Sequence, residues 1–348
     1  MKKGLINLPA RLLAACKRAD MLLLGLVLVL GMLMMYRYGP VEPSLSIEEG
    51  DEAPLVADSG SEPAAAIEAP LPAAGKPVRF LMYNVQNYFV AGEESRSRFK
   101  SQLKPRQSKE AVADVIASVA PEIVGLVEMG GDRALADLQE RLKARGLEYP
   151  HSVVLEREGE DRALALLSQH PIVRNDSRRN FSLHGQKRRK MLRGILDATV
   201  MLEDGRYFRI VGAHLKSRVA NDAAAAEHLR AREARTLAFY LHEQMKHAPN
   251  VPILVYGDWN DGPEDGSLGI LRKGVSSRSS LSRLSPVDSQ GQDWTLYFKG
   301  GREYYVFDQV FFNSVLNKRC GRKVRSGIVD IKQAARASDH RAVWCEIR

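Results

Sequence analysis

Short apolar runs alternate with amphipathic segments from residue 78 to the end of the chain. The short runs predict strands, at Val78–Tyr83, Ile123–Val127, Ala163–Leu167, Gly194–Leu202, Tyr207–Ala213, Val251–Tyr256, Thr295–Phe298, Val306–Phe312 and Ala342–Glu346. Segments with apolar residues three and four positions apart predict helices at Ser108–Val119, Ala134–Arg145 and Ala223–His247. Asp222 is placed to cap the last helix. Strands interleaved with helices predict an α/β fold in which helices cover stacked sheets.

The first 75 residues have a different pattern. Residues 1–20 are basic, residues 21–38 contain an uninterrupted apolar run, and residues 39–75 are acidic and rich in Pro and Ala. An apolar run that follows positive charge predicts a transmembrane signal anchor with its N-terminus in the cytoplasm. A cleaved signal peptide is the alternative, although the basic region is long and no A-x-A site follows the run. The acidic stretch predicts a disordered tether.

These segments predict a single-pass membrane protein whose globular domain, residues 76–348, lies outside the cytoplasm, in the periplasm if the cell is Gram-negative. Residues 1–38 carry a net charge of +5 and the tether −8, so the total of +9 leaves +12 for the domain. A basic domain favours an anionic partner such as nucleic acid or phospholipid head groups; an effect on solubility alone is the alternative. In an oxidising compartment Cys320 and Cys345 are either a disulfide or two buried thiols.

Polar side chains gather where the predicted strands end. They are Asn84 and Asn87, Glu128, His214 and Lys216, Asp258 and Asn260, Asp308 inside a strand, and Asp339 and His340 before the last strand. One such residue alone is more often a cap or a surface group. Six sites composed of Asn, Glu, Asp and His are hard to explain in that way.

These residue types suit the hydrolysis of a phosphodiester. Carboxylate and amide oxygens are the ligands that Mg²⁺ prefers, with Mn²⁺ as the alternative ion. Such a cation neutralises charge on phosphoryl oxygens, and a histidine held by a carboxylate can stabilise the transition state. No zinc-type Cys/His spacing, Walker A loop or GxSxG elbow competes with this interpretation.

The motifs NVQN, GDWND and SDH, together with a glutamate at a strand end, resemble the endonuclease/exonuclease/phosphatase superfamily over residues 78–348. With its N-terminal segments, the chain resembles a membrane-anchored bacterial-type member. The resemblance implies the deoxyribonuclease I-like fold: a four-layered α/β sandwich of two central mixed β-sheets flanked by helices. It places the site at one edge of the two sheets.

The resemblance also implies roles. Glu128 is the principal ligand of the divalent metal, Asn84 helps to hold the ion, and Asp339 is a further ligand, directly or through water. Asp258 orients or deprotonates the attacking water, and Asn260 contacts the phosphate.

Two histidines receive roles in the same way. His340 faces the phosphate with Asp308 supporting its ring, and His214 is a second active-site histidine. Lys216 resembles a lysine that touches the phosphate in secreted bacterial members, and Asn87 is a further candidate for binding the substrate.

The basic segment Arg178–Arg193 is either a groove that tracks phosphates or a solvated loop, and Arg193 is its best candidate for a phosphate contact. The sequence favours a metal-dependent nuclease acting on DNA or RNA outside the cytoplasm. A sphingomyelinase-like phosphodiesterase or phosphatase acting on lipids or head groups is the alternative, and a non-catalytic phosphate-binding module is the second alternative. No obligate protein partner is inferred.

Overall fold

The computed structural model describes residues 75–92, 103–157, 160–264, 266–321 and 324–348. The predicted basic N-terminus (1–20), signal anchor (21–38) and tether (39–75, apart from Gly75) lie outside these ranges and stay predictions. Within them, no helix is both long enough and apolar enough to cross a membrane.

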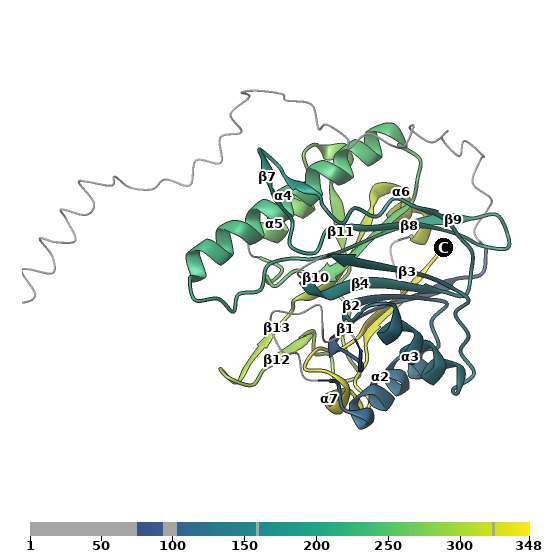
Figure 1. The fold of residues 1–348 in the computed structure, drawn as a ribbon. Helices are drawn as coiled ribbons and strands as arrows, with labels where there is room; N and C mark the ends of the chain where they lie inside the picture. The colour runs from purple at the N-terminus through teal and green to yellow at the C-terminus, as the bar shows by residue number, and fades with distance from the viewer. Residues whose placement is uncertain (1–74, 93–102, 158–159, 265, 322–323) are drawn as a thin grey trace, which may run out of the picture. The chain divides into compact units, whose positions relative to one another are not determined.

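Two six-stranded sheets form the centre of the domain (Figure 1). The first has the order β15 (Ser326–Ile328), β16 (Val343–Ile347), β1 (Val78–Tyr88), β2 (Ile123–Met129), β4 (Glu160–Ser168), β3 (His151–Arg157). The second has the order β11 (Leu281–Arg283), β14 (Asp308–Asn313), β10 (Ile253–Asp258), β9 (Tyr207–His214), β8 (Leu196–Met201), β5 (Ile172–Asn175). Both are mixed: β1 is parallel to β2 and antiparallel to β16, while β10 is parallel to β9 and antiparallel to β14.

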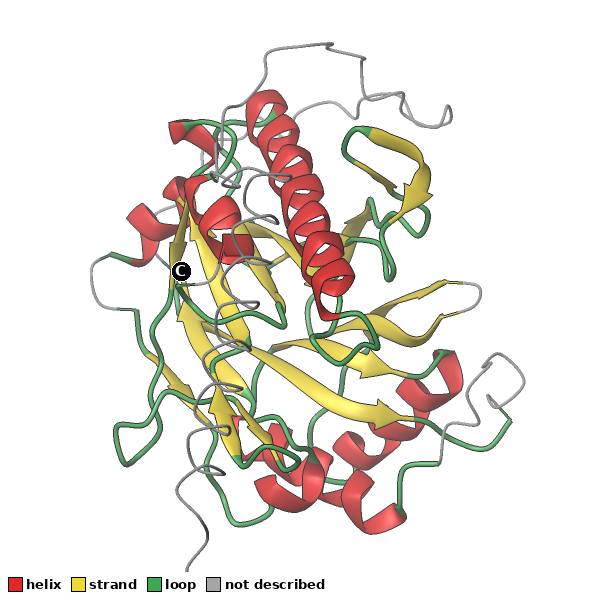
Figure 2. Ribbon diagram, turned by 90° about the vertical axis from the view of Figure 1, so that its left-hand side faces the viewer, coloured by secondary structure: helices red, strands yellow, loops and turns green. Residues whose placement is uncertain are grey.

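Helices cover the outer face of each sheet, as Figure 2 shows. Those that pack on the first sheet are α2 (Arg106–Val119), α3 (Asp132–Lys143) and α7 (Ala334–Ala337). Those on the second sheet are α4 (Ala223–His247) and α5 (Gly266–Lys273). The short elements α6 (Ser314–Cys320) and η2 (Ser277–Ser279) follow β14 and α5. One apolar cluster fills the space between the sheets and two others lie beneath the helices, so the predicted four-layered sandwich is confirmed.

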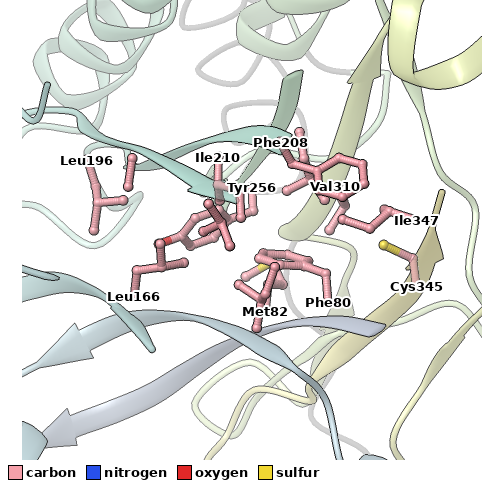
Figure 3. Packing of buried hydrophobic residues seen from close by; sticks show 14 of the residues in the cluster. Phe80, Met82, Leu166, Leu196, Phe208, Ile210, Tyr256, Val310, Cys345 and Ile347 are labelled. Carbon is pink, nitrogen blue, oxygen red and sulfur yellow. The ribbon is translucent and has the colours of Figure 1, made fainter. Parts of the chain in front are cut away.

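Tyr256 of β10 joins the two sheets through the central core (Figure 3). Its ring lies 5.4 Å from that of Phe80 on β1, centroid to centroid, and its hydroxyl donates a 3.1 Å hydrogen bond to the carbonyl of Ala165 on β4. A Cβ at Gly125 would come within 2.6 Å of this ring, so that position of β2 needs glycine. The two sheets are therefore held at a fixed spacing close to their polar strand ends.

Some of the shorter elements differ in the structure from what the sequence predicts. The predicted strand Thr295–Phe298 lies outside both large sheets, because β12 (Leu296–Phe298) forms its ladder with β13 (Glu303–Tyr305) and has one isolated bridge to His340. The segment Arg178–Arg193 contains a small hairpin of β6 (Ser182–Leu183) and β7 (Gln186–Lys190). Cys320 and Cys345 are free thiols, the latter buried in the central core.

Candidate active site

The pairing of the strands brings the predicted site residues to one edge of the two sheets. In the second sheet Asp258, the last residue of β10, pairs with His214 on β9 and with Asp308 on β14. In the first sheet Asn84 lies on β1 and Glu128 on its parallel neighbour β2. The carboxyl ends of parallel strands meet at the same edge of a sheet, so residues distant in sequence become neighbours here.

Asp258 occupies the middle of this cluster and is 2% exposed. Its Oδ2 accepts a 2.9 Å hydrogen bond from the Asn84 amide and lies 3.5 Å from His214 Nε2. Its Oδ1 accepts a 3.0 Å hydrogen bond from the backbone N–H of Asn260. Burial raises the pKa of the Asp258 carboxyl against the opposing charge of His340, so this group accepts a proton more readily than an exposed aspartate.

His340 and Asp308 form a buried pair. His340 Nδ1 lies 2.7 Å from Asp308 Oδ2, and His340 Nε2 is left to face Asp258 at 3.9 Å. Burial disfavours the imidazolium, but the carboxylates of Asp308, Asp258 and Asp339 outweigh it and raise the pKa of His340 to about 10. The ring is thus a fixed cation with its Nε2–H directed into the cluster.

Glu128 and His214 form the other side of the cluster. Glu128 Oε1 lies 4.0 Å from His214 Nε2, and Glu128 Oε2 accepts a 3.1 Å hydrogen bond from the Asn87 backbone. Burial and the positive charges of Arg193 and Arg162 lower the pKa of His214 well below its usual value. His214 is therefore neutral, in contrast to His340.

The backbone at the site is strained. Six described non-glycine residues have a positive φ, and four of them are Gln86, Asn87, Glu128 and Asn260. The pairing of β1 with β2 is also irregular at Asn84–Tyr88, and that of β2 with β4 is irregular at Val127–Met129. Such conformations cost about 1–3 kcal/mol each and persist where the surrounding structure holds them. Their concentration at one edge indicates that the backbone there departs from regular strand pairing in order to orient the side chains of the cluster.

The donor atoms present fit a hard divalent cation. One ligand atom each from Glu128, His214 and Asp258 lies within 4.8 Å of the others. Asp258, Asp308 and His340 meet the same distance, but a protonated His340 has no lone pair to offer a metal. Each set has two carboxylates and neither contains a thiolate, which suits Mg²⁺ or Mn²⁺ better than a soft metal. The Asn84 oxygen accepts from the Gln86 N–H while its nitrogen faces Asp258, so the role of Asn84 in holding a metal stays a prediction.

The remaining predicted residues surround the cluster at different depths. Asp339 is 31% exposed, with Oδ1 4.0 Å from His340 Nε2. The Asn87 side chain accepts from Arg162, and the Lys216 ammonium donates to the carbonyls of Ser217 and Val219 in its own loop.

Arg193 directly precedes the predicted strand Gly194–Leu202, and in the structure it lies in the loop before β8. Its side chain is 7% exposed, with Nη1 3.4 Å from the carbonyl of Leu215 and Nε 3.7 Å from Glu160. The positive charge of Arg193 helps to lower the pKa of His214. The guanidinium therefore borders the cluster from the second sheet.

Two cations near the site were missing from the sequence-based prediction. Arg162 on β4 donates a 2.7 Å hydrogen bond to Asn87 and lies 3.5 Å from Glu128 Oε2. Lys104 donates to the Gln86 carbonyl, and burial lowers the pKa of its ammonium to about 8 against the attraction of Asp339 and Glu128. A basic residue at the start of a buried strand was the available signal for Arg162, whereas Lys104 gave none.

The chain belongs to the endonuclease/exonuclease/phosphatase family, whose sequence model matches residues 83–340. Enzymes of this family hydrolyse phosphoester bonds and generally use divalent metal ions. A comparison with curated proteins gave no significant match.

Solved structures of the same fold are similar to this chain at low sequence identity. The catalytic domain of human Nocturnin with bound sulfate has 19% identity and a TM-score of 0.54, covering 78% of this chain and 94% of that one. An endonuclease/exonuclease/phosphatase from Beutenbergia cavernae has 17% identity and a TM-score of 0.56, covering 79% and 72%. One from Bacteroides vulgatus has 15% identity and a TM-score of 0.57, covering 79% and 99%. At these identities, the likeness establishes the fold.

Proposed function

We propose that this chain is a divalent-metal-dependent phosphodiesterase that cleaves nucleic acid. The observation that carries the proposal is the buried cluster around Asp258. The Asp258 carboxylate is surrounded there by the charged His340, the neutral His214 and the amide of Asn84. Burying so many ionisable groups together is costly for stability. Such a cluster is typical of an active site, where groups with opposed pKa shifts divide the work of moving protons.

Glu128 would hold the Mg²⁺ or Mn²⁺ ion, with Asp339 and Asn84 as further candidates at the same edge. When bound, the ion supplies positive charge that neutralises the phosphoryl oxygens. The strained backbone of Glu128, with a φ of 62°, aims its carboxylate across the gap between the sheets toward His214. Arg162 holds the second carboxylate oxygen at 3.5 Å and keeps the group in place.

Asp258 accepts the proton of the attacking water. Its raised pKa brings its basicity closer to neutrality, and the hydrogen bonds from Asn84 and Asn260 fix the orientation of both oxygens. His340, kept protonated by Asp308, presents its Nε2–H to the phosphate and stabilises the charge that develops there. Neutral His214 adds a second imidazole beside Asp258 without a competing positive charge.

Nucleic acid is the proposed substrate because the domain is strongly basic and several cations border the cluster. Residues 76–348 carry +12 of net charge by composition, after the −8 of residues 39–75 and the +5 of residues 1–38 are removed from the total of +9. Arg162 and Arg193 flank the site from the two sheets. Cations beside a hydrolytic site attract a polyanion and position its backbone. The N-terminal segments would present this activity outside the cytoplasm, at a membrane.

The purified full-length chain, assayed with Mg²⁺ against DNA, RNA, sphingomyelin and phosphoinositides, tests this proposal. We expect cleavage of DNA or RNA and complete loss of that cleavage in excess EDTA. Full activity in EDTA would contradict the metal requirement. Cleavage of a lipid substrate alone would support the lipid phosphodiesterase that the sequence leaves as an alternative.

A further inference from the structure

The hairpin of β12 and β13 lies outside both central sheets (Figure 1). It carries a cluster of aromatic side chains. The rings of Trp294 and Tyr297 each lie 4.8 Å from the ring of Tyr304, centroid to centroid. Tyr304 is 60% exposed and Phe298 is 41% exposed. They are the two aromatic residues among the exposed large hydrophobic side chains in the described part of the chain. Exposed rings are thus gathered on one element.

This hairpin is joined directly to the catalytic pair. Leu296 of β12 forms a β-bridge with His340, and the Tyr297 N–H donates to the Asp339 carbonyl at 3.1 Å. The hydroxyl of Thr295, at the base of the hairpin, accepts a 2.9 Å hydrogen bond from the backbone N–H of Asp308. A chain molecule whose phosphate binds at His340 would therefore have its neighbouring units close to the hairpin.

Cations are interleaved with these rings. The Arg341 guanidinium lies 4.1 Å above the Trp294 ring and is also ion-paired with Asp288 at 2.7 Å. Arg218 lies 5.1 Å from the ring of the buried Phe307 and is ion-paired with Asp261 at 3.1 Å. Lys299 and Arg302 are exposed in the turn between the strands; the acidic residues of this surface are Asp293 and Glu303. The exposed rings of Phe298 and Tyr304 beside the exposed cations Lys299 and Arg302 suit an unpaired strand, whose bases stack on rings and whose phosphates attract cations.

We infer that the β12–β13 hairpin is a stacking platform for the bases of single-stranded nucleic acid beside the scissile phosphate. This inference rests on the proposed function and narrows it, because bases inside a duplex are already stacked and do not offer their faces to Tyr304. Tyr304 and Phe298 are positioning residues here, since they hold the strand and do not touch the reacting atoms.

Binding is best measured in chains that carry Asp258→Asn, which prevents turnover. Fluorescence anisotropy would compare a short labelled oligothymidylate with a duplex containing the same labelled strand. We expect Tyr304→Ala to weaken single-strand binding about tenfold, the usual effect of removing one stacked ring. The loss for the duplex should be clearly smaller. Tyr304→Phe, which keeps the ring, should retain single-strand affinity.

Val173→Ala, an exposed substitution on β5, is the matched surface control, and the melting temperature of each variant checks folding. Unchanged single-strand affinity in Tyr304→Ala would overturn the inference, as would an equal loss for the duplex. Weaker binding to sphingomyelin–phosphatidylcholine vesicles, with oligonucleotide binding intact, would assign the hairpin to a lipid surface instead. Hydrolysis of bis(4-nitrophenyl) phosphate by the wild-type chain tests the proposed function separately. If no hydrolysis occurs, the proposed function fails, while the comparison of single-strand and duplex binding still tests the hairpin.

Discussion

The sequence predicts functional roles for the strand-end cluster around Asp258 and for the basic segment Arg178–Arg193. The two regions differ in the structure in how their side chains are arranged and buried. The cluster is built from strands of both sheets and its groups are nearly all buried. The basic segment forms a hairpin beside α4, where His184 stacks on Phe239 with ring centroids 3.7 Å apart (Figure 1). Arg188 and Arg189 are exposed there. The side chains of the Asp258 cluster meet at one buried position, while those of the basic segment distribute positive charge over an exposed surface.

The difference shows what each kind of pattern can indicate. Polar residues at strand ends carry information about convergence, because parallel strands bring their ends to a common edge. A run of charge carries information only about the electric field around the molecule. Substitutions in the cluster should therefore have large, specific effects, and substitutions in the basic hairpin small effects that depend on salt.

The largest effect on metal binding should come from Glu128→Gln. Removing the charge of the principal ligand should weaken Mn²⁺ binding by at least about 100-fold, more than the loss of a residue that only supports a ligand. Titration calorimetry with Mn²⁺ measures it, and Glu148→Gln, an exposed carboxylate 70% accessible to solvent, is the control. Equal Mn²⁺ affinity in the two variants would remove Glu128 from the metal site.

Asp308→Asn should lower kcat by about 100-fold. The amide no longer keeps His340 protonated, so the ring loses the positive charge that faces the phosphate. Steady-state kinetics with bis(4-nitrophenyl) phosphate measures the change, and KM should move much less than kcat. A change in KM alone would show that the pair binds the substrate without acting in the reaction.

The same pair should give stability a characteristic dependence on pH. The pKa of His340 is raised to about 10 in the folded state, so its ion pair stabilises fully below the usual histidine pKa, and the stabilisation is lost as pH rises through about 10. The difference in unfolding free energy between wild type and Asp308→Asn should therefore shrink between pH 7 and pH 10.5, by on the order of 2 kcal/mol. Urea denaturation at both pH values measures it. A difference that stays constant would mean that His340 is neutral in the fold.

The smallest effect should come from neutralising the basic hairpin. Replacing Arg188, Arg189 and Lys190 with Gln should weaken DNA binding by less than about tenfold and reduce the slope of log K against log salt by about one unit per lost phosphate contact. Binding measured across a range of salt concentrations checks this. Wild-type salt dependence in the triple variant would show that the hairpin does not contact the nucleic acid.

Much of this architecture could be read from the sequence because its long elements have clear periods. The helix Ala223–His247 is confirmed at both ends, and the Asp222 side chain accepts from the Ala225 N–H as its cap. Of the nine predicted strands, four are longer than predicted and five begin one or two residues later. β1, for example, continues to Tyr88, so Asn84 and Asn87 lie inside the strand and not beyond its predicted end at Tyr83.

The rest depends on pairings that no local pattern encodes. The hairpins β6–β7 and β12–β13 have strands too short to show a period of two residues. Arg162 reaches Glu128 only because β4 pairs with β2, which places Met129 opposite Ala163. Local spacing can indicate which residues end a strand, but the partner strand comes from tertiary packing.

Hydrolysis of bis(4-nitrophenyl) phosphate with Mg²⁺ by wild type, Asp258→Asn and Glu148→Gln tests the central claim that the strand ends form one catalytic site. Asp258 contacts Asn84, His214 and the Asn260 backbone, so its loss should remove proton transfer from the water. The account predicts that kcat/KM falls at least about 1000-fold in Asp258→Asn and stays at the wild-type value in Glu148→Gln. A folded Asp258→Asn variant with activity within tenfold of wild type would contradict it.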